Sequence, residues 1–311
     1  VASSSPLGDF DRFHAEGKIP VSAGDVKQAM ATVKKYSFEL AGADGGPLRG
    51  DVRTAARGAG RPAVVICHGF KGFKDWGFFP HLAERIATAG MTTASFNFSG
   101  SGVGPDGESF SEPERFADNT YSRELRDLET VLGALADGSL LDDLSVPTKF
   151  GLFGHSRGGA AALIHASENS AVDSLVTWST FASVERWSAD VIEQWRTEGK
   201  LDIVNARTGD VLPIRTGILE DMEQNSERLN LIAAAGKLRI PWLIIHGEED
   251  LTVSVEDAES FHKAVNNEMT ELVILGGTGH TFGAQHPWVG MTPALSRAMD
   301  ATVARFVKDL F

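Results

Sequence analysis

A serine flanked by glycines is the strongest chemical signal in the sequence. Ser156 stands at the centre of G-H-S-R-G (residues 154–158), directly after an apolar run and directly before a stretch of small residues. In a strand–turn–helix context this G-x-S-x-G pattern presents a nucleophilic hydroxyl on a sharp turn. The start of the helix adds free N–H groups and the positive end of its dipole beside that oxygen. We predict Ser156 to be a nucleophile; the alternative is an ordinary glycine-rich turn.

A serine hydroxyl is a weak nucleophile and needs a base that a third group orients. In chains with a turn of this kind, the catalytic acid and then the catalytic histidine follow the serine along the sequence. Asp250 lies in H-G-E-E-D-L-T-V (246–253) and His280 in G-G-T-G-H-T-F (276–282), each just past a predicted strand. We predict Asp250 to be the acid and His280 the base. Glu249 and His286 are the respective alternatives.

The oxyanion of an acyl-transfer reaction needs hydrogen-bond donors, commonly two backbone N–H groups. One is expected from Arg157, the residue after the nucleophile. The other is expected from Phe70 in the loop H-G-F-K-G-F (68–73), which follows the first predicted parallel strand. A plain turn is the alternative for this loop.

These residues need a scaffold, and the hydrophobic pattern predicts a doubly wound α/β sheet. Six short runs are apolar on both faces, as in parallel strands covered by helices; they span 63–67, 92–98, 148–153, 174–178, 242–246 and 271–275. Helix-length segments alternate with them: 79–89, 122–136, 158–167, 255–265 and 292–310. Two earlier strand candidates, 33–40 and 48–54, predict an N-terminal antiparallel hairpin.

About 60 residues separate the fourth and fifth of these runs, where a single helix would suffice. We expect them to form an amphipathic helix around 184–195, a hairpin over 201–213 and a second helix over 218–235. This insertion, about 181–237, is predicted to be a cap above the carboxyl edge of the sheet, where α/β folds bind ligands. Trp187 and Trp195 are candidate substrate-binding residues within it, with helix packing as the alternative.

Taken together, H-G-F-x-G, G-H-S-x-G-G, H-G-x-x-D-x-x-V and G-H-x-F resemble the α/β-hydrolase superfamily, from about residue 33 to the end. Within it the chain looks most like the feruloyl/cinnamoyl esterases and the dienelactone-hydrolase-like esterases. The resemblance implies a serine esterase without a cofactor, with Ser156, Asp250 and His280 as triad and a cap inserted after the sixth strand. Dienelactone hydrolases proper use a cysteine nucleophile, so Ser156 departs from their pattern. An N-terminal arm (1–30) is predicted to precede the hydrolase domain (31–311).

The composition narrows the classes of partner. The 311 residues include 29 Lys and Arg against 42 Asp and Glu, a net charge of −13, which disfavours nucleic acid and anionic membrane surfaces. The single cysteine, Cys67, permits no internal disulfide or cysteine-rich zinc site and is expected in the core. The nine histidines form no ligand cluster in the sequence, so neither metal nor cofactor is expected. No apolar run is long enough to span a bilayer.

We therefore expect a soluble, cytoplasmic carboxylic ester hydrolase that acts on small or aryl esters through an acyl-enzyme intermediate. A leader removed before Val1 and a homodimer are both left open. Three alternatives remain: a serine peptidase, a thioester or C–C hydrolase of the same fold, and a non-enzymatic ligand receptor that keeps the triad. The net charge is compatible with a small, neutral or weakly charged ester.

Overall fold

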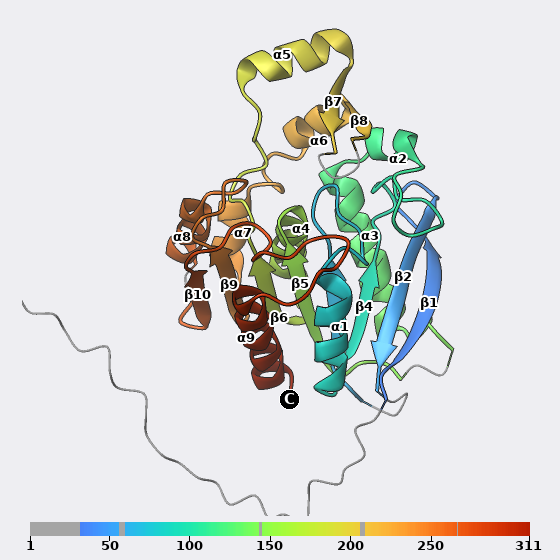
Figure 1. Ribbon diagram of the computed structural model, residues 1–311, viewed down its shortest axis with the longest axis vertical. Coiled ribbons are helices and arrows are strands. Elements are labelled where there is room, and N and C mark those ends of the chain that lie inside the picture. The colour runs from blue at the N-terminus through green and yellow to red at the C-terminus, as the bar shows by residue number, and fades with distance from the viewer. Residues whose placement is uncertain (1–31, 56–59, 143–144, 206–208, 266) are drawn as a thin grey trace, which may run out of the picture. The chain divides into compact units, whose positions relative to one another are not determined.

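The computed structural model describes residues 32–55, 60–142, 145–205, 209–265 and 267–311. The predicted arm, 1–30, lies outside the described residues. Eight strands of the described chain form one sheet in the order β1-β2-β4-β3-β5-β6-β9-β10 (Figure 1). Their bounds are β1 Lys34–Ala41, β2 Pro47–Thr54, β3 Ala63–Cys67, β4 Thr92–Phe96, β5 Phe150–His155, β6 Val172–Trp178, β9 Trp242–Gly247 and β10 Thr270–Leu275.

The sheet is parallel except at β2, which runs antiparallel to both of its neighbours, β1 and β4. From β4 to β10 every neighbouring pair is parallel. The antiparallel hairpin closes at Gly42, whose N–H donates to the carbonyl of Gly46. Asp127 connects this turn to the segment after β4, because its carboxylate accepts the N–H groups of both Ala43 and Ser99. The predicted mostly parallel sheet with an N-terminal hairpin is confirmed.

Helices cover both faces of the sheet. On one face lie α1 (Phe79–Thr88) and α9 (Pro293–Leu310), in front of the strands in Figure 1. On the other lie α3 (Tyr121–Ala136), α4 (Arg157–Glu168), α7 (Leu231–Lys237) and α8 (Val255–Ala264). The central strands β3, β4, β5 and β9 are buried along their whole length, which is why their sequences are apolar on both faces.

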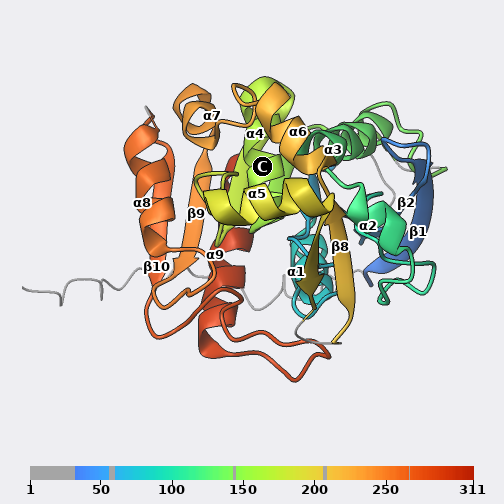
Figure 2. The same cartoon turned by 90° about the horizontal axis from the view of Figure 1, so that it is seen from above.

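The insertion between β6 and β9 rises above the carboxyl edge of the sheet (Figures 1 and 2). It contains α5 (Ala189–Glu198), the hairpin β7 (Lys200–Val204) and β8 (Val211–Arg215), α6 (Gly217–Gln224) and then α7. The predicted hairpin is confirmed; its tip, 206–208, lies outside the described residues. A short helix that the sequence did not predict, α2 (Pro113–Ala117), packs against β8.

Both predicted helices of the insertion are wrong in extent, and local side-chain hydrogen bonds explain why. The helix expected over 184–195 begins only at Ala189, because Ser188 caps it by accepting the N–H of Val191. The helix expected over 218–235 is two helices. Asn225 ends the first by folding its amide back onto Asp221, and Asn230 caps the second. The second of them, α7, packs on α4 and α8 beside the sheet.

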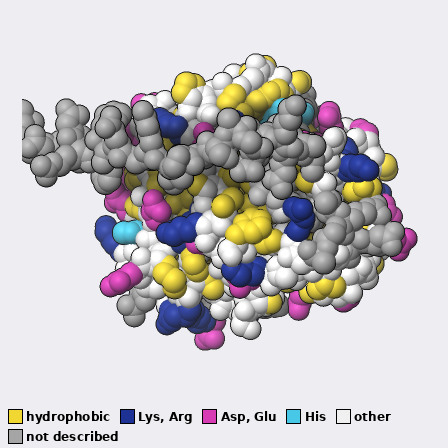
Figure 3. Space-filling model, turned by 90° about the horizontal axis from the view of Figure 1, so that it is seen from below, with side chains coloured by type: hydrophobic (Ala, Val, Ile, Leu, Met, Phe, Trp, Pro, Cys, Tyr) yellow, Lys and Arg dark blue, Asp and Glu magenta, His cyan; other side chains and the backbone are white. Residues whose placement is uncertain are grey.

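The face opposite the insertion carries both signs of charge. Figure 3 shows Lys, Arg, Asp and Glu side chains interspersed with apolar ones on that side. Within the described residues, no helix has the length and apolar character that crossing a bilayer requires.

Two glycines allow the packing of α4 against β5 to be tested. A Cβ atom on Gly154 would overlap the carbonyl oxygen of Gly158 and lie 2.5 Å from the Cα of Gly159, so strand and helix would have to separate. We expect Gly154→Ala to lower the free energy of unfolding by about 2–3 kcal/mol or more, as overpacking does. Urea denaturation followed by circular dichroism measures this change.

Gly133→Ala is the matched control. Gly133 is an exposed glycine within α3, and a Cβ there would meet no atom within 4 Å. This substitution should raise the free energy of unfolding by about 0.5–1 kcal/mol through helix propensity. Equal effects of the two substitutions would contradict a tight α4–β5 contact.

Candidate active site

Ser156 lies on the turn between β5 and α4, in a strained backbone conformation. Its φ of 54° and ψ of −119° are unusual for a residue with a side chain. The backbone N–H of Ser156 donates to the carbonyl of Trp178 in β6, at 2.8 Å, which ties the turn to the next strand. A Cβ on Gly158 would overlap the carbonyl oxygens of His68 and Cys67. The turn is therefore held by contacts that only glycine permits.

The loop after β3 lies directly against this serine. A Cβ built on Gly69 would be 3.1 Å from the Cβ of Ser156, so the loop backbone passes beside the hydroxyl. Phe70 is the next residue, and it lines the same pocket as Ser156. Arg157 is the first residue of α4, where a backbone N–H has no acceptor within the helix. The two predicted oxyanion donors thus flank Ser156.

His68 orients the peptide group between Gly69 and Phe70. The N–H of Phe98 donates to its Nε2 at 3.2 Å, so the proton sits on Nδ1, which donates to the carbonyl of Gly69 at 2.9 Å. In a trans peptide the N–H points opposite to the carbonyl. The N–H of Phe70 consequently points away from the His68 ring. Burial lowers the pKa of His68 to about 4, so this tautomer persists at neutral pH.

Asp250 and His280 meet although 30 residues separate them. The Nδ1 of His280 lies 2.7 Å from Oδ2 of Asp250, which is buried in the loop after β9. The other carboxylate oxygen accepts the backbone N–H groups of Thr252 and Val253. Burial works against ionisation of Asp250, but hydrogen bonds from histidine and backbone outweigh it and hold its pKa well below the usual range. An ionised acceptor keeps a proton on Nδ1 and leaves Nε2 as the basic nitrogen.

A second histidine, His246, contacts the same carboxylate from within the core. Its side chain is fully buried, and its Nε2 lies 2.9 Å from the carbonyl of Val253 and 3.4 Å from Oδ2 of Asp250. It therefore fixes the loop that carries the acid. Sequence reasoning did not single it out, although its position four residues before Asp250, at the end of β9, was a usable signal.

His155 fixes the main chain of the base. Its Nε2 donates to the carbonyl oxygen of His280 at 3.0 Å, and the two rings meet edge-on with their centroids 4.8 Å apart. Burial lowers the pKa of His155 to about 3, with the neighbouring His280 acting in the same direction. His155 is thus a neutral hydrogen-bond donor. The sequence motif contained it without revealing this contact.

The rival residues lie elsewhere. Glu249 is exposed, and it is Asp250 whose carboxylate contacts His280. His286 stacks on Trp76, with centroids 6.3 Å apart, and accepts the N–H of Gly77 through Nδ1. Cys67 is buried at the end of β3, and burial raises the pKa of its thiol far above the usual range.

Ser156 and His280 open into one pocket of about 390 Å³ below the insertion. Its walls combine aromatic and cationic side chains: Phe70, Lys71, Tyr121, Arg157, Phe181, Arg186 and Trp187, with Thr252 and Val253. Of the two tryptophans predicted to bind substrate, Trp187 lines this pocket. Trp195 is fully buried, contacts Trp187 edge-on, and donates its indole N–H to the carbonyl of Ile214. The pocket lining does not include Trp195.

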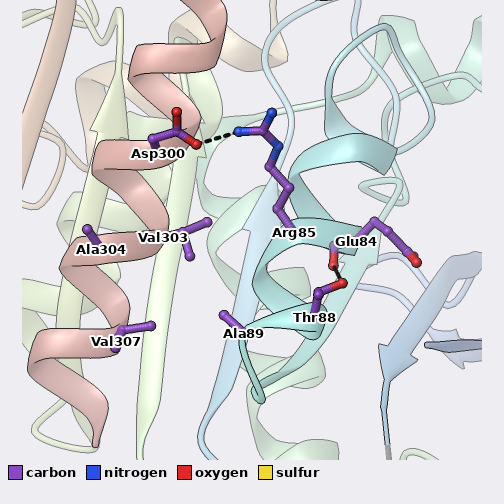
Figure 4. Close-up of a pocket in the computed structure, with 8 residues that line it drawn as sticks. All are labelled: Glu84, Arg85, Thr88, Ala89, Asp300, Val303, Ala304 and Val307. Atoms are coloured by element: carbon purple, nitrogen blue, oxygen red, sulfur yellow. Dashed lines mark hydrogen bonds and ion pairs between the residues drawn. The ribbon is translucent and has the colours of Figure 1, made fainter. Parts of the chain in front are cut away.

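A larger hollow, about 600 Å³, lies between α1 and α9 (Figure 4). Arg85 and Asp300 form an ion pair across it at 2.6 Å, and its floor is formed by alanine and valine. None of the eight residues that line it is a histidine, cysteine or serine, so it holds no Ser–His or Cys–His pair. Across the described residues, no three His, Cys, Asp or Glu side chains converge as a metal site would require.

The sequence matches the Alpha/beta hydrolase family over residues 64–291, more than half of the chain. The chain belongs to this family. It is accordingly a hydrolase of that fold, with the insertion placed between β6 and β9. A comparison with curated protein sequences gives no significant match.

Solved structures show the same fold. Est1E from Butyrivibrio proteoclasticus has a TM-score of 0.62 and 19% identity, covering 88% of this chain and 98% of that chain. Dienelactone hydrolase from Anabaena variabilis has a TM-score of 0.59 and 19% identity, covering 90% and 100%. A puromycin-hydrolyzing peptidase from Mycobacterium tuberculosis has a TM-score of 0.63 and 19% identity, covering 92% of this chain and 41% of that chain.

The buried histidines predict how stability depends on pH. The pKa of His155, about 3 in the folded protein, is depressed from an ordinary value near 6.5. Below about pH 6.5 the unfolded chain therefore binds a proton that the folded chain does not. The free energy of unfolding consequently decreases as the pH is lowered. Each such histidine contributes a slope of about 1.4 kcal/mol per pH unit. His155→Gln should remove one such contribution between about pH 5.5 and 4.5, as measured by urea denaturation.

His262→Gln is the control, because His262 is an exposed histidine on α8. It should leave the slope as in the unsubstituted protein. If His155→Gln also left the slope unchanged, His155 would not be held neutral in the folded state.

Proposed function

We propose that this hydrolase cleaves carboxylic esters through an acyl-enzyme intermediate on Ser156. The observation that carries the proposal is the strained backbone of Ser156 in one pocket with His280, whose Nδ1 is 2.7 Å from buried Asp250. A nucleophile, a base and an orienting acid are thereby available at one wall of a pocket.

Acylation begins when Nε2 of His280 takes the proton of the Ser156 hydroxyl and Oγ attacks the ester carbonyl carbon. Negative charge moves to the carbonyl oxygen, where the backbone N–H groups of Phe70 and Arg157 stabilise it. Each such donor contributes about 3–4 kcal/mol in related enzymes. Collapse of the tetrahedral intermediate breaks the ester C–O bond, and His280 protonates the departing alcohol.

Deacylation repeats these steps with water as the nucleophile. His280 removes a proton from water, the resulting hydroxide attacks the acyl carbonyl, and Ser156 leaves with the proton that His280 returns. Asp250 remains ionised throughout and stabilises the imidazolium that forms in each half-reaction. His155 and His246 act as positioning residues, since one holds the main chain of His280 and the other the loop of Asp250.

The pocket supports small or aryl esters as substrates. Aromatic side chains surround it, and an aromatic ring packs favourably against such walls. Est1E has a solved structure with ferulic acid bound, with a TM-score of 0.63 and 21% identity to this chain. We propose that the insertion is a cap, in which Trp187 contacts the substrate and the buried Trp195 packs against Trp187.

Kinetics with 4-nitrophenyl acetate and butyrate test the proposal. Ser156→Ala and His280→Gln should each lower kcat by about 10⁴- to 10⁶-fold, because each removes a member of one catalytic unit. Asp250→Asn should lower it by about 10⁴-fold, since the base loses its orienting charge. Circular dichroism and thermal melts verify that each variant is folded.

Three matched substitutions serve as controls. Ser254→Ala, His286→Gln and Glu249→Gln change a serine, a histidine and a carboxylate outside the proposed triad, and each should keep kcat/KM within about twofold. A kcat of Ser156→Ala within about tenfold of that of the unsubstituted protein, with the other variants behaving as stated, would refute the assignment of the nucleophile.

A further inference from the structure

The candidate active-site pocket is cationic in a chain that is strongly acidic. Three of its lining residues, Lys71, Arg157 and Arg186, carry positive charge, and its described lining contains no aspartate or glutamate. The whole chain has 42 acidic and 29 basic residues, so its overall composition would not predict a pocket lined only by basic charges. Clustered charge of one sign in a cleft attracts ligands of the opposite sign.

Arg157 is partly neutralised within the protein. Its Nε lies 2.9 Å from Oε2 of the buried Glu124, and its guanidinium lies over the ring of Tyr121, 4.1 Å from the centroid. Its Nη2 is buried and has no hydrogen-bond partner in the described structure. This buried Nη2 is not accessible to a ligand, so Arg157 contributes its charge rather than a free hydrogen-bond donor to the pocket.

The side chains of Lys71 and Arg186 donate hydrogen bonds to main-chain carbonyls rather than to carboxylates. Lys71 Nζ donates to the carbonyl of Val204 at 3.3 Å, and Arg186 Nη2 donates to that of Thr252 at 2.7 Å. Neither has a carboxylate oxygen within 4 Å among the described residues. Burial lowers the pKa of the Lys71 ammonium, and no carboxylate charge opposes this effect. An anion bound beside these cations would supply the missing countercharge.

The net charge of −13 opposes an anionic ligand, but only at long range. At an ionic strength of about 0.1 M the Debye length is about 10 Å, so distant surface carboxylates are largely screened. Contacts between a ligand and the pocket cations are a few ångströms long and only weakly screened. The local charge therefore decides what binds, while the global charge affects the rate of encounter.

We propose that the substrate ester carries a carboxylate, in its acyl or its alcohol part, that Lys71 and Arg186 bind. This inference rests on the proposed esterase function and specifies its substrate class. Lys71 follows the oxyanion donor Phe70 directly, and Arg186 is anchored beside the loop of Asp250, so the two cations approach the reacting ester from different elements. The guanidinium of Arg186 also packs on Phe181, 4.8 Å from its centroid, which orients it.

Two pairs of esters test the proposal and separate the two parts of the substrate. The acyl pair is mono-4-nitrophenyl adipate and its methyl ester; the alcohol pair is 4-acetoxybenzoate and 4-acetoxybenzamide. On at least one pair the wild type should favour the anion in kcat/KM by about tenfold or more. Lys71→Gln and Arg186→Gln should each reduce this ratio, and the double variant should bring it near one.

Arg196→Gln is the matched control, an exposed arginine of the insertion that pairs with Glu223 outside the pocket. It should leave the ratio unchanged. Ratios near one for the wild type on both pairs, with Ser156-dependent hydrolysis of the neutral esters, would overturn the inference and leave the esterase proposal intact.

If no ester is hydrolysed, the esterase proposal fails and binding decides the inference separately. Calorimetry should then show benzoate binding about tenfold more tightly than benzamide, with the difference lost in the Lys71→Gln/Arg186→Gln variant. Equal affinity for both compounds would overturn the inference.

Discussion

The close approach of α4 to β5 is the constraint on which the rest of the site depends. It holds Ser156 at φ 54°, a conformation that costs about 1–3 kcal/mol for a residue with a side chain. Gly154 makes that approach sterically feasible, and Gly158 allows α4 to approach the end of β3 as well, since a Cβ on either glycine would overlap a backbone carbonyl. The same contact brings the N-terminus of α4 and the loop after β3 to one oxygen. The tight packing of α4 therefore determines where the hydroxyl of Ser156 lies.

Three buried histidines hold the main chain around this hydroxyl. His68 orients the peptide before Phe70, His155 holds the carbonyl of His280, and His246 holds the loop of Asp250. Burial keeps the pKa of His68 and His155 low, so their hydrogen bonds do not change with protonation near neutral pH. His280 differs from them because it lines the pocket and contacts an ionised carboxylate.

Much of the scaffold was predictable from the sequence, because a covered parallel sheet needs strands that are apolar on both faces. The strand predicted at 63–67 matches β3, and the glycine pattern around Ser156 predicted its turn. Order along the chain was enough to predict that Asp250 pairs with His280, but it left Glu249 open as the acid until the structure placed Asp250 against the histidine. Those features depend on local composition and on which edge of the sheet a residue follows.

What the sequence did not reveal depends on contacts between distant segments or on competing local bonds. The helix spacing of Val184 to Trp195 predicted one helix, but the cap at Ser188 starts it later and leaves Trp187 in the loop before it. That displacement directs Trp187 to the pocket while Trp195 enters the core. The cationic lining likewise joins Lys71 and Arg186, which are 115 residues apart (186 − 71), so composition alone could not indicate it.

Covalent trapping tests the central claim most directly. A fluorophosphonate mimics the tetrahedral intermediate and reacts only with a serine that its own site activates. We expect a mass increase of one adduct per chain, located by peptide mapping on Ser156, with none on Ser156→Ala. An unmodified protein, or an adduct on another residue, would contradict it.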